Sequence, residues 1–186
     1  MELSEKIGEG HHRECFAVDG ENLIVKKLKR KKQRSCFLKK LLPVRNVNAE
    51  EFQLYKSLPG SLKEYLPSYM EMKDDILIME RITDYDGNFS KTVLEYGRIE
   101  NDNFWEETER IARILTEEKV WMFDIFHHGN NIVVKKISED TFIPVLIDFK
   151  RVGWRAYPLQ LNLLFEKEKR KKFRRRFGSF LKRYRA

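Results

Sequence analysis

Cysteine, histidine and long apolar runs are all scarce in this chain of 186 residues. Two cysteines, Cys15 and Cys36, are too few for a disulfide framework, and a reduced pair is typical of the cytosol. No apolar run reaches the 18 residues of a transmembrane helix, and the N-terminal residues lack the basic start and apolar core of a signal peptide. We therefore expect a cytoplasmic protein.

The histidines do not predict a metal site. His127 and His128 are adjacent, but a zinc site needs three or four ligands, and neither Cys15 nor Cys36 has the spacing to join them. We expect these two imidazoles to stabilise a loop.

The net charge of +8 is unevenly distributed along the chain. Residues 166–186 contain eleven lysines and arginines against two glutamates, and residues 26–40 contain nine and no acid. All residues before 166 together carry about −1, so the part of the chain outside these two blocks is acidic on balance. Two such cationic patches are suited to phosphate, nucleic acid or an anionic membrane surface.

The apolar pattern predicts an α+β fold in which strands dominate the N-terminal part. Hydrophobic content of 41% and aromatic content of 12% are values of folded domains. Alternation and turn signals predict strands and one helix in the first part, and helices around a strand pair in the second. The expected elements are strands at 3–7, 14–18, 23–25, 69–72 and 76–82, helices at 49–58 (capped by Asn48), at 103–119 and from 166, and two short strands around 131–148.

Two apolar runs in the second half carry the strongest functional motif. Asn131 opens the run Ile132-Val133-Val134, and Asp148 follows the run Leu146-Ile147, seventeen residues after Asn131. Kinase-type phosphotransferases place such an Asn and Asp beside ATP as metal ligands. Because Mg²⁺ prefers oxygen ligands, an amide and a carboxylate at neighbouring strand ends predict a magnesium site.

Residues that precede this pair fit contacts with the nucleotide. Gly8 and Gly10 lie in a turn where backbone amides can approach phosphate, although the motif taken alone favours a plain hairpin turn. Lys26 follows an apolar strand, where a lysine grips the α- and β-phosphates, and Glu51 on the next helix is placed to orient it. A solvated basic edge is the alternative for Lys26, and Glu50 competes with Glu51.

The end of the strand predicted at 76–82 is the expected adenine contact. Backbone groups around Glu80 and Ile82 would bind the base there if this segment links two lobes. The predicted order of elements is three strands, a helix, two strands, a helix and a strand pair that carries the metal ligands. Kinase-like folds have this order.

Several positions depart from the kinase pattern. The catalytic base would stand five residues before Asn131, where the chain has Phe126. Asp124 is the candidate base instead, with His128 as an alternative that would polarise an acceptor hydroxyl. Arg13 stands in place of the third glycine of the phosphate loop, and Lys150 in place of the glycine after Asp148-Phe149; either cation can neutralise phosphate charge.

The basic tail from Glu166 carries aromatic residues at steps of three and four, at Phe173, Phe177, Phe180 and Tyr184. One interpretation is a last helix that packs its aromatic face on the body and leaves the cations in water. A second is an interfacial helix whose aromatics insert into an anionic membrane. Nucleic-acid binding is a third, but no base-reading module is recognisable.

Four segments give the chain a family resemblance. Residues 8–16, the helix from Glu51, residues 82–87 and residues 137–145 resemble the YrbL family, over roughly residues 3 to 165. The resemblance implies a protein kinase-like fold, because this family is regarded as a relative of that fold. Residues 146–151 and the basic tail are also similar to the sugar kinases that phosphorylate the Kdo residue of lipopolysaccharide.

Together these observations predict one kinase-like domain of class α+β. We expect a small antiparallel-sheet N-lobe with one helix (1–82), a reduced helical C-lobe (83–165) and a basic C-terminal helix (166–186). The predicted function is ATP- and Mg²⁺-dependent phosphotransfer to a hydroxyl of a small molecule, sugar or protein. The alternatives are a nucleotide-binding pseudokinase with a regulatory role, and a peripheral protein that binds anions or the inner-membrane surface.

Overall fold

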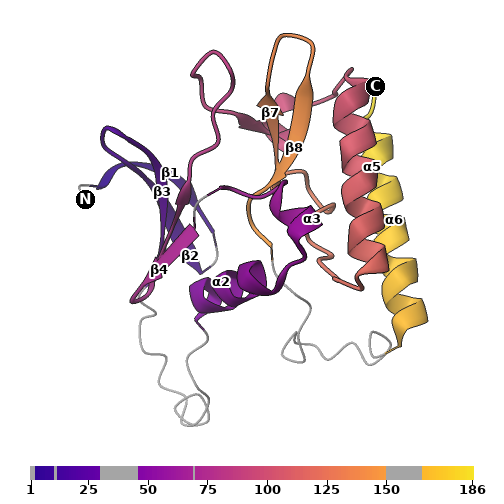
Figure 1. The fold of residues 1–186 in the computed structure, drawn as a ribbon, viewed down its shortest axis with the longest axis horizontal. Coiled ribbons are helices and arrows are strands. Elements are labelled where there is room, and N and C mark those ends of the chain that lie inside the picture. Colours follow the sequence, from indigo (N-terminus) through magenta and orange to yellow (C-terminus); the bar gives the residue numbers. More distant parts are fainter. Residues whose placement is uncertain (1–2, 11, 30–45, 69, 150–164) are drawn as a thin grey trace. The chain divides into compact units, whose positions relative to one another are not determined.

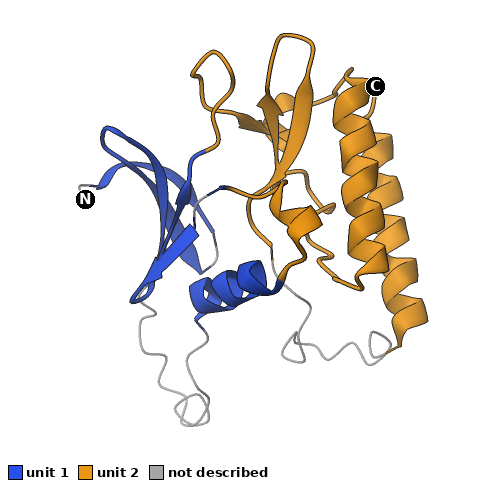
Figure 2. Ribbon diagram, viewed as in Figure 1, with its two compact units in different colours: residues 1–57, 68–81 blue, residues 58–67, 82–186 orange. Residues whose placement is uncertain are grey.

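The chain folds into two compact units (Figure 2). Unit 1 is Met1–Ser57 with Ser68–Arg81, and unit 2 is Leu58–Pro67 with Ile82–Ala186. The structure, a computed structural model, describes residues 3–10, 12–29, 46–68, 70–149 and 165–186. Both units combine an antiparallel sheet with helices, which confirms the α+β class.

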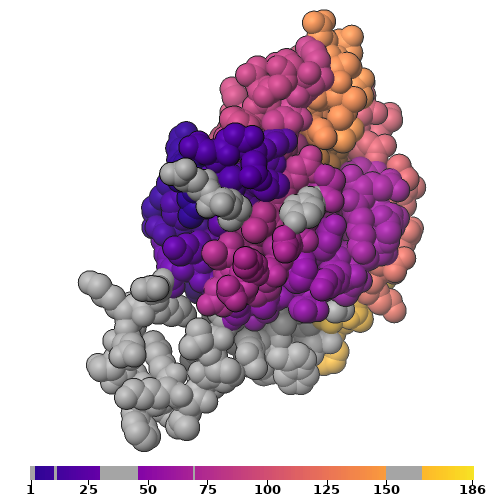
Figure 3. Space-filling model, turned by 60° about the vertical axis from the view of Figure 1, so that its left-hand side comes forward, coloured from indigo at the N-terminus to yellow at the C-terminus, as the bar shows by residue number. Residues whose placement is uncertain are grey.

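In its described residues, unit 1 is a five-stranded antiparallel sheet with one helix (Figure 1). Its strand order is β1-β2-β3-β5-β4. The elements are β1 (Leu3–Glu9), β2 (Arg13–Val18), β3 (Glu21–Leu28), α2 (Val47–Ser57), β4 (Met70–Lys73) and β5 (Ile76–Glu80). β1 is the exposed edge strand, whose indigo surface is visible in Figure 3.

Local sequence explains the turns of unit 1. Gly20, with a φ of 68°, closes the β2–β3 hairpin as the Asp19-Gly20 pair predicts, and Asp74, with a φ of 53°, turns β4 into β5. The predicted cap of the helix was wrong. Asn46 Oδ1 accepts hydrogen bonds from the backbone N–H groups of Asn48 and Ala49, so α2 begins two residues early and Asn48 lies inside it.

The strand register assigns the side chains of β3 and β5 to two faces of the sheet. Lys26 pairs with Leu77 and Val25 with Ile78, so these pairs point to opposite faces. Val25 and Ile78 form a small apolar cluster with Val18. Lys26 points to the face that carries α2, because it bonds to a side chain of that helix.

Unit 2 combines a three-stranded antiparallel sheet with helices. The strand order is β6-β7-β8. The elements are α3 (Gly60–Lys63), β6 (Lys91–Thr92), α4 (Val93–Tyr96), α5 (Asp102–Glu117), β7 (Ile132–Lys136), β8 (Phe142–Leu146) and α6 (Glu166–Tyr184). The apolar pattern does not predict α3, β6 or α4, which have two to four residues each. So short an element has too few positions to show a period.

Helix α5 begins where the sequence provides a cap, because Asn101 Oδ1 accepts a hydrogen bond from Phe104 N. Its apolar positions recur every three or four residues, and the residues of this buried face are Phe104, Trp105, Thr108, Ile111, Ala112 and Leu115. This face packs against β8 and against α6, which lies beside α5 in Figure 1.

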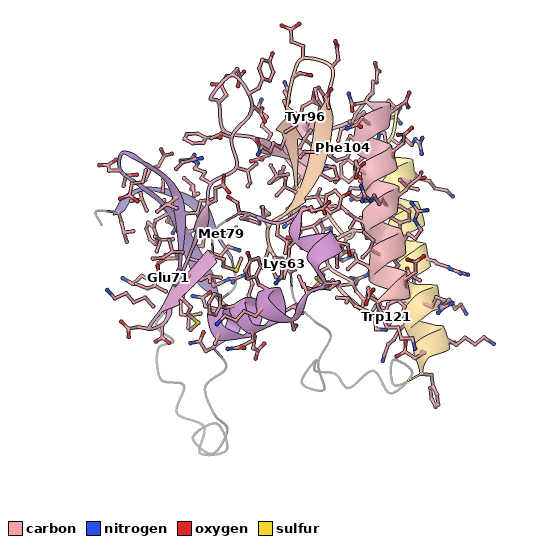
Figure 4. The ribbon with its side chains drawn as sticks, viewed as in Figure 1. Lys63, Glu71, Met79, Tyr96, Phe104 and Trp121 are labelled. Carbon is pink, nitrogen blue, oxygen red and sulfur yellow. The ribbon has the colours of Figure 1, made fainter. Side chains whose placement is uncertain are left out.

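Helix α6 packs its aromatic face on the body of unit 2. Phe173, Phe180 and Tyr184 are at most 4% exposed, and the Trp105 and Phe180 rings meet edge to face with centroids 6.0 Å apart. Trp121, labelled in Figure 4 near the start of α6, packs on Phe173 and donates a hydrogen bond to Glu166. The structure thus agrees with the first interpretation of the tail. No helix in the described part of the chain is long and apolar enough to cross a bilayer.

Candidate functional site

The first group of candidate residues is a buried ion cluster in unit 1. Lys26 on β3 and Glu51 on α2 form an ion pair with Nζ and Oε1 2.8 Å apart. The side chain of Glu51 is fully buried and that of Lys26 is 7% exposed. The predicted contact between these residues is confirmed, and the competitor Glu50 lies exposed on the helix.

Arg13 completes this cluster together with a residue that sequence reasoning missed. The Arg13 guanidinium forms a second ion pair with Glu51 and donates a hydrogen bond to Asn48 Oδ1 at 3.1 Å. Asn48 donates in turn to the backbone oxygens of Lys26 and Asp75, at 2.8 Å and 2.6 Å. Arg13 was predicted at the nucleotide phosphates; the structure places its guanidinium against Glu51.

The burial of this cluster makes its geometry rigid. Two cations share one carboxylate, and all three side chains are at most 7% exposed. A buried charge costs several kcal/mol unless it is paired and hydrogen-bonded, so the three groups depend on one another. The carboxylate therefore fixes the position of the Lys26 ammonium on the sheet.

The candidate phosphate loop lies beside this cluster in sequence. Gly8 falls within β1, and the backbone N–H of Gly10 donates to Arg13 O at 2.8 Å, which makes the turn. A Cβ on either glycine would meet its nearest heavy atom only at 3.8 Å, and neither residue has a positive φ. Neither steric crowding nor a positive φ therefore requires glycine at these two positions.

The residues predicted at adenine lie at the end of β5 and directly after it. The carboxylate of Glu80, in unit 1, accepts a hydrogen bond from Ser68 N at 2.8 Å. Ile82, in unit 2, is buried at 7% exposure, and its carbonyl oxygen accepts from Ser90 N at 3.1 Å. Their role toward a nucleotide stays a prediction.

The second group lies at one end of the β7–β8 hairpin in unit 2. Ile132 pairs with Leu146, and Ile147 N donates to Asn131 O at 3.1 Å. Because the strands are antiparallel, Asn131 and Asp148 come to the same end of the hairpin, away from its loop. The structure thus places the two predicted metal ligands at neighbouring positions, one residue out of direct register.

The Asn131 side chain is oriented by the loop that precedes it. Its Nδ2 donates to the backbone oxygen of Asp124 at 3.0 Å, and the residue is 9% exposed. With the nitrogen held in this way, the amide oxygen Oδ1 is the atom left for a cation. An amide oxygen beside a carboxylate is a donor set that fits Mg²⁺.

Asp124 approaches Asn131 through its backbone, while its carboxylate bonds elsewhere. Arg176 Nη1, on α6, lies 2.9 Å from Asp124 Oδ1 and also donates to Phe123 O at 2.7 Å. The Asp124 side chain is 60% exposed, so solvent reaches it. The candidate base is therefore an accessible carboxylate that one arginine holds in place.

Phe126 occupies the position of the missing base as part of the core. It is 1% exposed, and its ring lies 4.8–5.6 Å from those of three aromatic residues of α6, which are Phe173, Phe177 and Phe180. This packing ties the loop to the helix.

Tyr184 and Gly129 fasten the other end of this loop to α6. Tyr184 OH donates to His128 O at 2.7 Å. Gly129 has a φ of 77°, and a Cβ there would come within 2.9 Å of the Tyr184 ring. Only glycine accommodates both conditions. The His128 ring is exposed and lies 3.7 Å from that of His127, whose pKa is lowered, first by burial and then by Arg176.

The structure therefore assembles two groups, one in each unit. It joins Lys26, Glu51 and Arg13 in unit 1, and brings Asn131, Asp148 and the backbone of Asp124 together in unit 2. Sequence reasoning missed Asn48, Arg176, Gly129 and Tyr184; the glycine after the histidine pair was the one signal available. Lys150 lies outside the described residues.

Comparison with known proteins identifies the family of this chain. No curated protein matches it. The family model described as PhoP regulatory network protein YrbL matches residues 1–185, which is nearly the whole sequence, and the chain therefore belongs to this family.

Proposed function

We propose that this protein is an ATP- and Mg²⁺-dependent phosphotransferase with a protein kinase-like fold. The observation that carries the proposal is the buried pair of Lys26 on β3 and Glu51 on α2, with Nζ and Oε1 2.8 Å apart. Protein kinases require such a pair between the third strand and a helix to orient the ATP phosphates. The YrbL family membership is compatible with this proposal.

Each candidate residue has a chemical task in the proposed reaction. Lys26 would bind the nucleotide phosphates, and Asn131 and Asp148 would hold Mg²⁺, which would supply positive charge to neutralise the phosphates. Asp124 takes the proton of the acceptor hydroxyl while that oxygen bonds to the γ-phosphorus and the bond from this phosphorus to ADP breaks. An accessible carboxylate suits this task, because it must meet the acceptor.

A nucleotide-binding protein without turnover is the second candidate. Two observations favour it: Phe126 is fully engaged in the core, and Arg176 neutralises the carboxylate of Asp124. In this case the metal ligands still bind ATP, and the protein acts through a regulatory partner.

Nucleotide binding is tested by thermal unfolding of the full chain with and without ATP and Mg²⁺. We expect stabilisation of about 3 kcal/mol at a hundredfold excess over Kd in the wild type. The Asp148→Asn variant should lose the part of this stabilisation that depends on Mg²⁺. Asp140→Asn is the matched control, because this exposed residue lies in the loop at the opposite end of the hairpin. A wild type that ATP and Mg²⁺ do not stabilise would contradict both candidates.

Turnover is tested by ³¹P NMR of ATP incubated with the protein. The phosphotransferase should release ADP faster than a protein-free sample, and Asp124→Asn should slow this by about a hundredfold or more while ATP still stabilises the variant. ADP release unaffected by Asp124→Asn would remove Asp124 as the base. Stabilisation by ATP without ADP release would favour the second candidate.

A further inference from the structure

Helix α6 has an outer face whose charges are not used by the fold. Six of its cations have no ion-pair partner among the residues that the structure describes; together we name them the basic face. These residues are Lys167, Arg170, Lys171, Arg174, Arg175 and Lys182. By contrast, Lys169, Arg176 and Arg185 pair with Glu166, Asp124 and Glu109.

The basic face lies along one side of the helix and has no member between Arg175 and Lys182. At 3.6 residues per turn, its six residues fall within an arc of about 140° and extend over roughly 22 Å. All six are exposed. Figure 4 shows nitrogen-tipped side chains projecting from α6 on the side that faces away from α5. The acids of the helix, Glu166 and Glu168, are confined to its first turn.

The fold itself does not explain this charge. Helix α6 is stabilised by Phe173, Phe180 and Tyr184 on its opposite face, and that packing needs no cation on the outside. Six like charges on one face repel one another, which destabilises the helix modestly. A multivalent anion bound to this exposed face would relieve the repulsion among its cations, so the face is suited to binding such an anion.

We propose that the basic face binds an anionic lipid surface, through electrostatic attraction to its phosphate headgroups. A flat surface can contact the whole arc at once, and each Lys or Arg near such a surface contributes to binding. Phe165, 68% exposed and directly before α6, provides an apolar side chain of the kind found at membrane interfaces. The three buried aromatics take no part, so the binding is more strongly salt-dependent than that of an inserted amphipathic helix.

A nucleic acid fits the basic face less well. Recognition of single strands relies on exposed aromatic side chains that stack on bases, and base edges are read by Asn, Gln or Arg in a groove. The basic face contains no aromatic residue and no side-chain amide, and the aromatics of α6 at Phe173, Phe180 and Tyr184 are buried. The lipid surface therefore remains the better match.

The test is cosedimentation of the full chain with vesicles, either of phosphatidylcholine alone or rich in phosphatidylglycerol. We expect binding to the anionic vesicles only, and release at high salt. The variant Lys171→Glu/Arg174→Glu/Arg175→Glu should lose about a hundredfold in partitioning. The control variant Lys91→Glu/Arg98→Glu/Arg113→Glu changes the net charge equally at exposed positions outside α6 and should bind as the wild type does.

The outcomes separate this proposal from the others. Equal losses in both variants would show that net charge alone acts and would overturn the basic face as a site. Equal binding to both kinds of vesicle, or binding to duplex DNA with none to vesicles, would overturn the lipid assignment. Thermal unfolding of both variants checks that they fold. No nucleotide is present, so the result is independent of the proposed phosphotransfer.

Discussion

The two groups of candidate residues are built in opposite ways. In unit 1, Lys26, Arg13 and Glu51 are almost fully buried and bond to one another. In unit 2, the carboxylate of Asp124 is 60% exposed, and its loop is held by aromatic packing on α6 and by hydrogen bonds that Arg176 and Tyr184 donate to its backbone oxygens. In unit 1, burial away from water fixes the charged groups relative to one another. In unit 2, the carboxylate remains in water, and contacts with α6 fix the backbone that carries it.

The difference shows where each group derives its rigidity. Buried charges position one another, so the loss of one leaves the others uncompensated. An exposed ion pair contributes little, and the loop of unit 2 depends on shape complementarity instead. We therefore expect unit 1 to be sensitive to changes of charge and the loop of unit 2 to be sensitive to changes of volume.

The largest expected effect is that of Glu51→Gln. Lys26 and Arg13 would remain buried without a carboxylate, which should lower the stability of unit 1 by about 3–5 kcal/mol. Hydrogen exchange of the β3 and β5 amides measures this loss directly. The tryptophans that the structure describes, Trp105 and Trp121, belong to unit 2, and their fluorescence reports on that unit.

The matched control is Glu50→Gln, which removes the same charge from an exposed position of α2. It should change stability by less than about 0.5 kcal/mol. If Glu51→Gln were equally mild, the cluster would not be the rigid element of unit 1.

Gly129→Ala should have the next largest effect. The methyl group would meet the Tyr184 ring at 2.9 Å while the backbone keeps a φ of 77°. The left-handed conformation costs about 1–2 kcal/mol and the overlap about 1–3 more. Urea unfolding followed by tryptophan fluorescence measures the sum.

Gly87→Ala separates the two contributions. Gly87 has a φ of 82°, but a Cβ added there would have no heavy atom within 4 Å, so only the conformational cost applies. Equal losses at Gly129 and Gly87 would show that the contact between the loop and Tyr184 is loose, and the volume argument would be wrong.

The exposed pair of Asp124 and Arg176 should contribute little to stability. A double-mutant cycle with Asp124→Ala and Arg176→Ala should give a coupling below about 1 kcal/mol. The pair of Arg185, directly after α6, and Glu109 of α5, exposed at 43% and 51%, serves as a reference of similar kind. A coupling of several kcal/mol would show that the Asp124–Arg176 pair contributes as much as the buried ion pairs of unit 1. The energetic difference between the two groups would then not hold.

The smallest effect concerns pH. Burial and Arg176 lower the pKa of His127 below its usual value of 6.5, so the folded protein binds its proton less readily than the unfolded chain does. Stability should therefore rise slightly as the pH rises through the interval from the folded pKa up to 6.5, and fall as it becomes more acidic. NMR titration, with His127→Gln for assignment, gives this pKa directly; a value above 6.5 would contradict the prediction.

Sequence alone predicted the contacts that follow from element type. The apolar run at 23–25 placed Lys26 just after a strand, helical spacing placed Glu51 on the next helix, and their ion pair is confirmed. Two apolar runs predicted the strands that bring Asn131 and Asp148 to one end of a hairpin. The start of α2 was predicted wrongly because two asparagines nearby can each cap a helix. Asn46 caps α2, and Asn48 lies inside it.

Contacts between distant segments were beyond prediction. Arg13 was expected at phosphate, and its bond to Glu51 spans 38 residues. Asp124 was separated from Arg176 by 52 residues, with no pattern in either segment that selects the other. The same holds for Tyr184 and His128, 56 residues apart.

The sequence by itself determined the longer strands and helices, the basic tail and the residue types at each strand end, because these follow from local periodicity and composition. Only the tertiary structure decided that α6 buries its aromatic face on the loop from Phe123 to Gly129 and leaves its cations outside. The pairing of apolar faces depends on side-chain shape and on the apolar area buried over the whole unit. This total area is a property of the fold, and no single segment determines it.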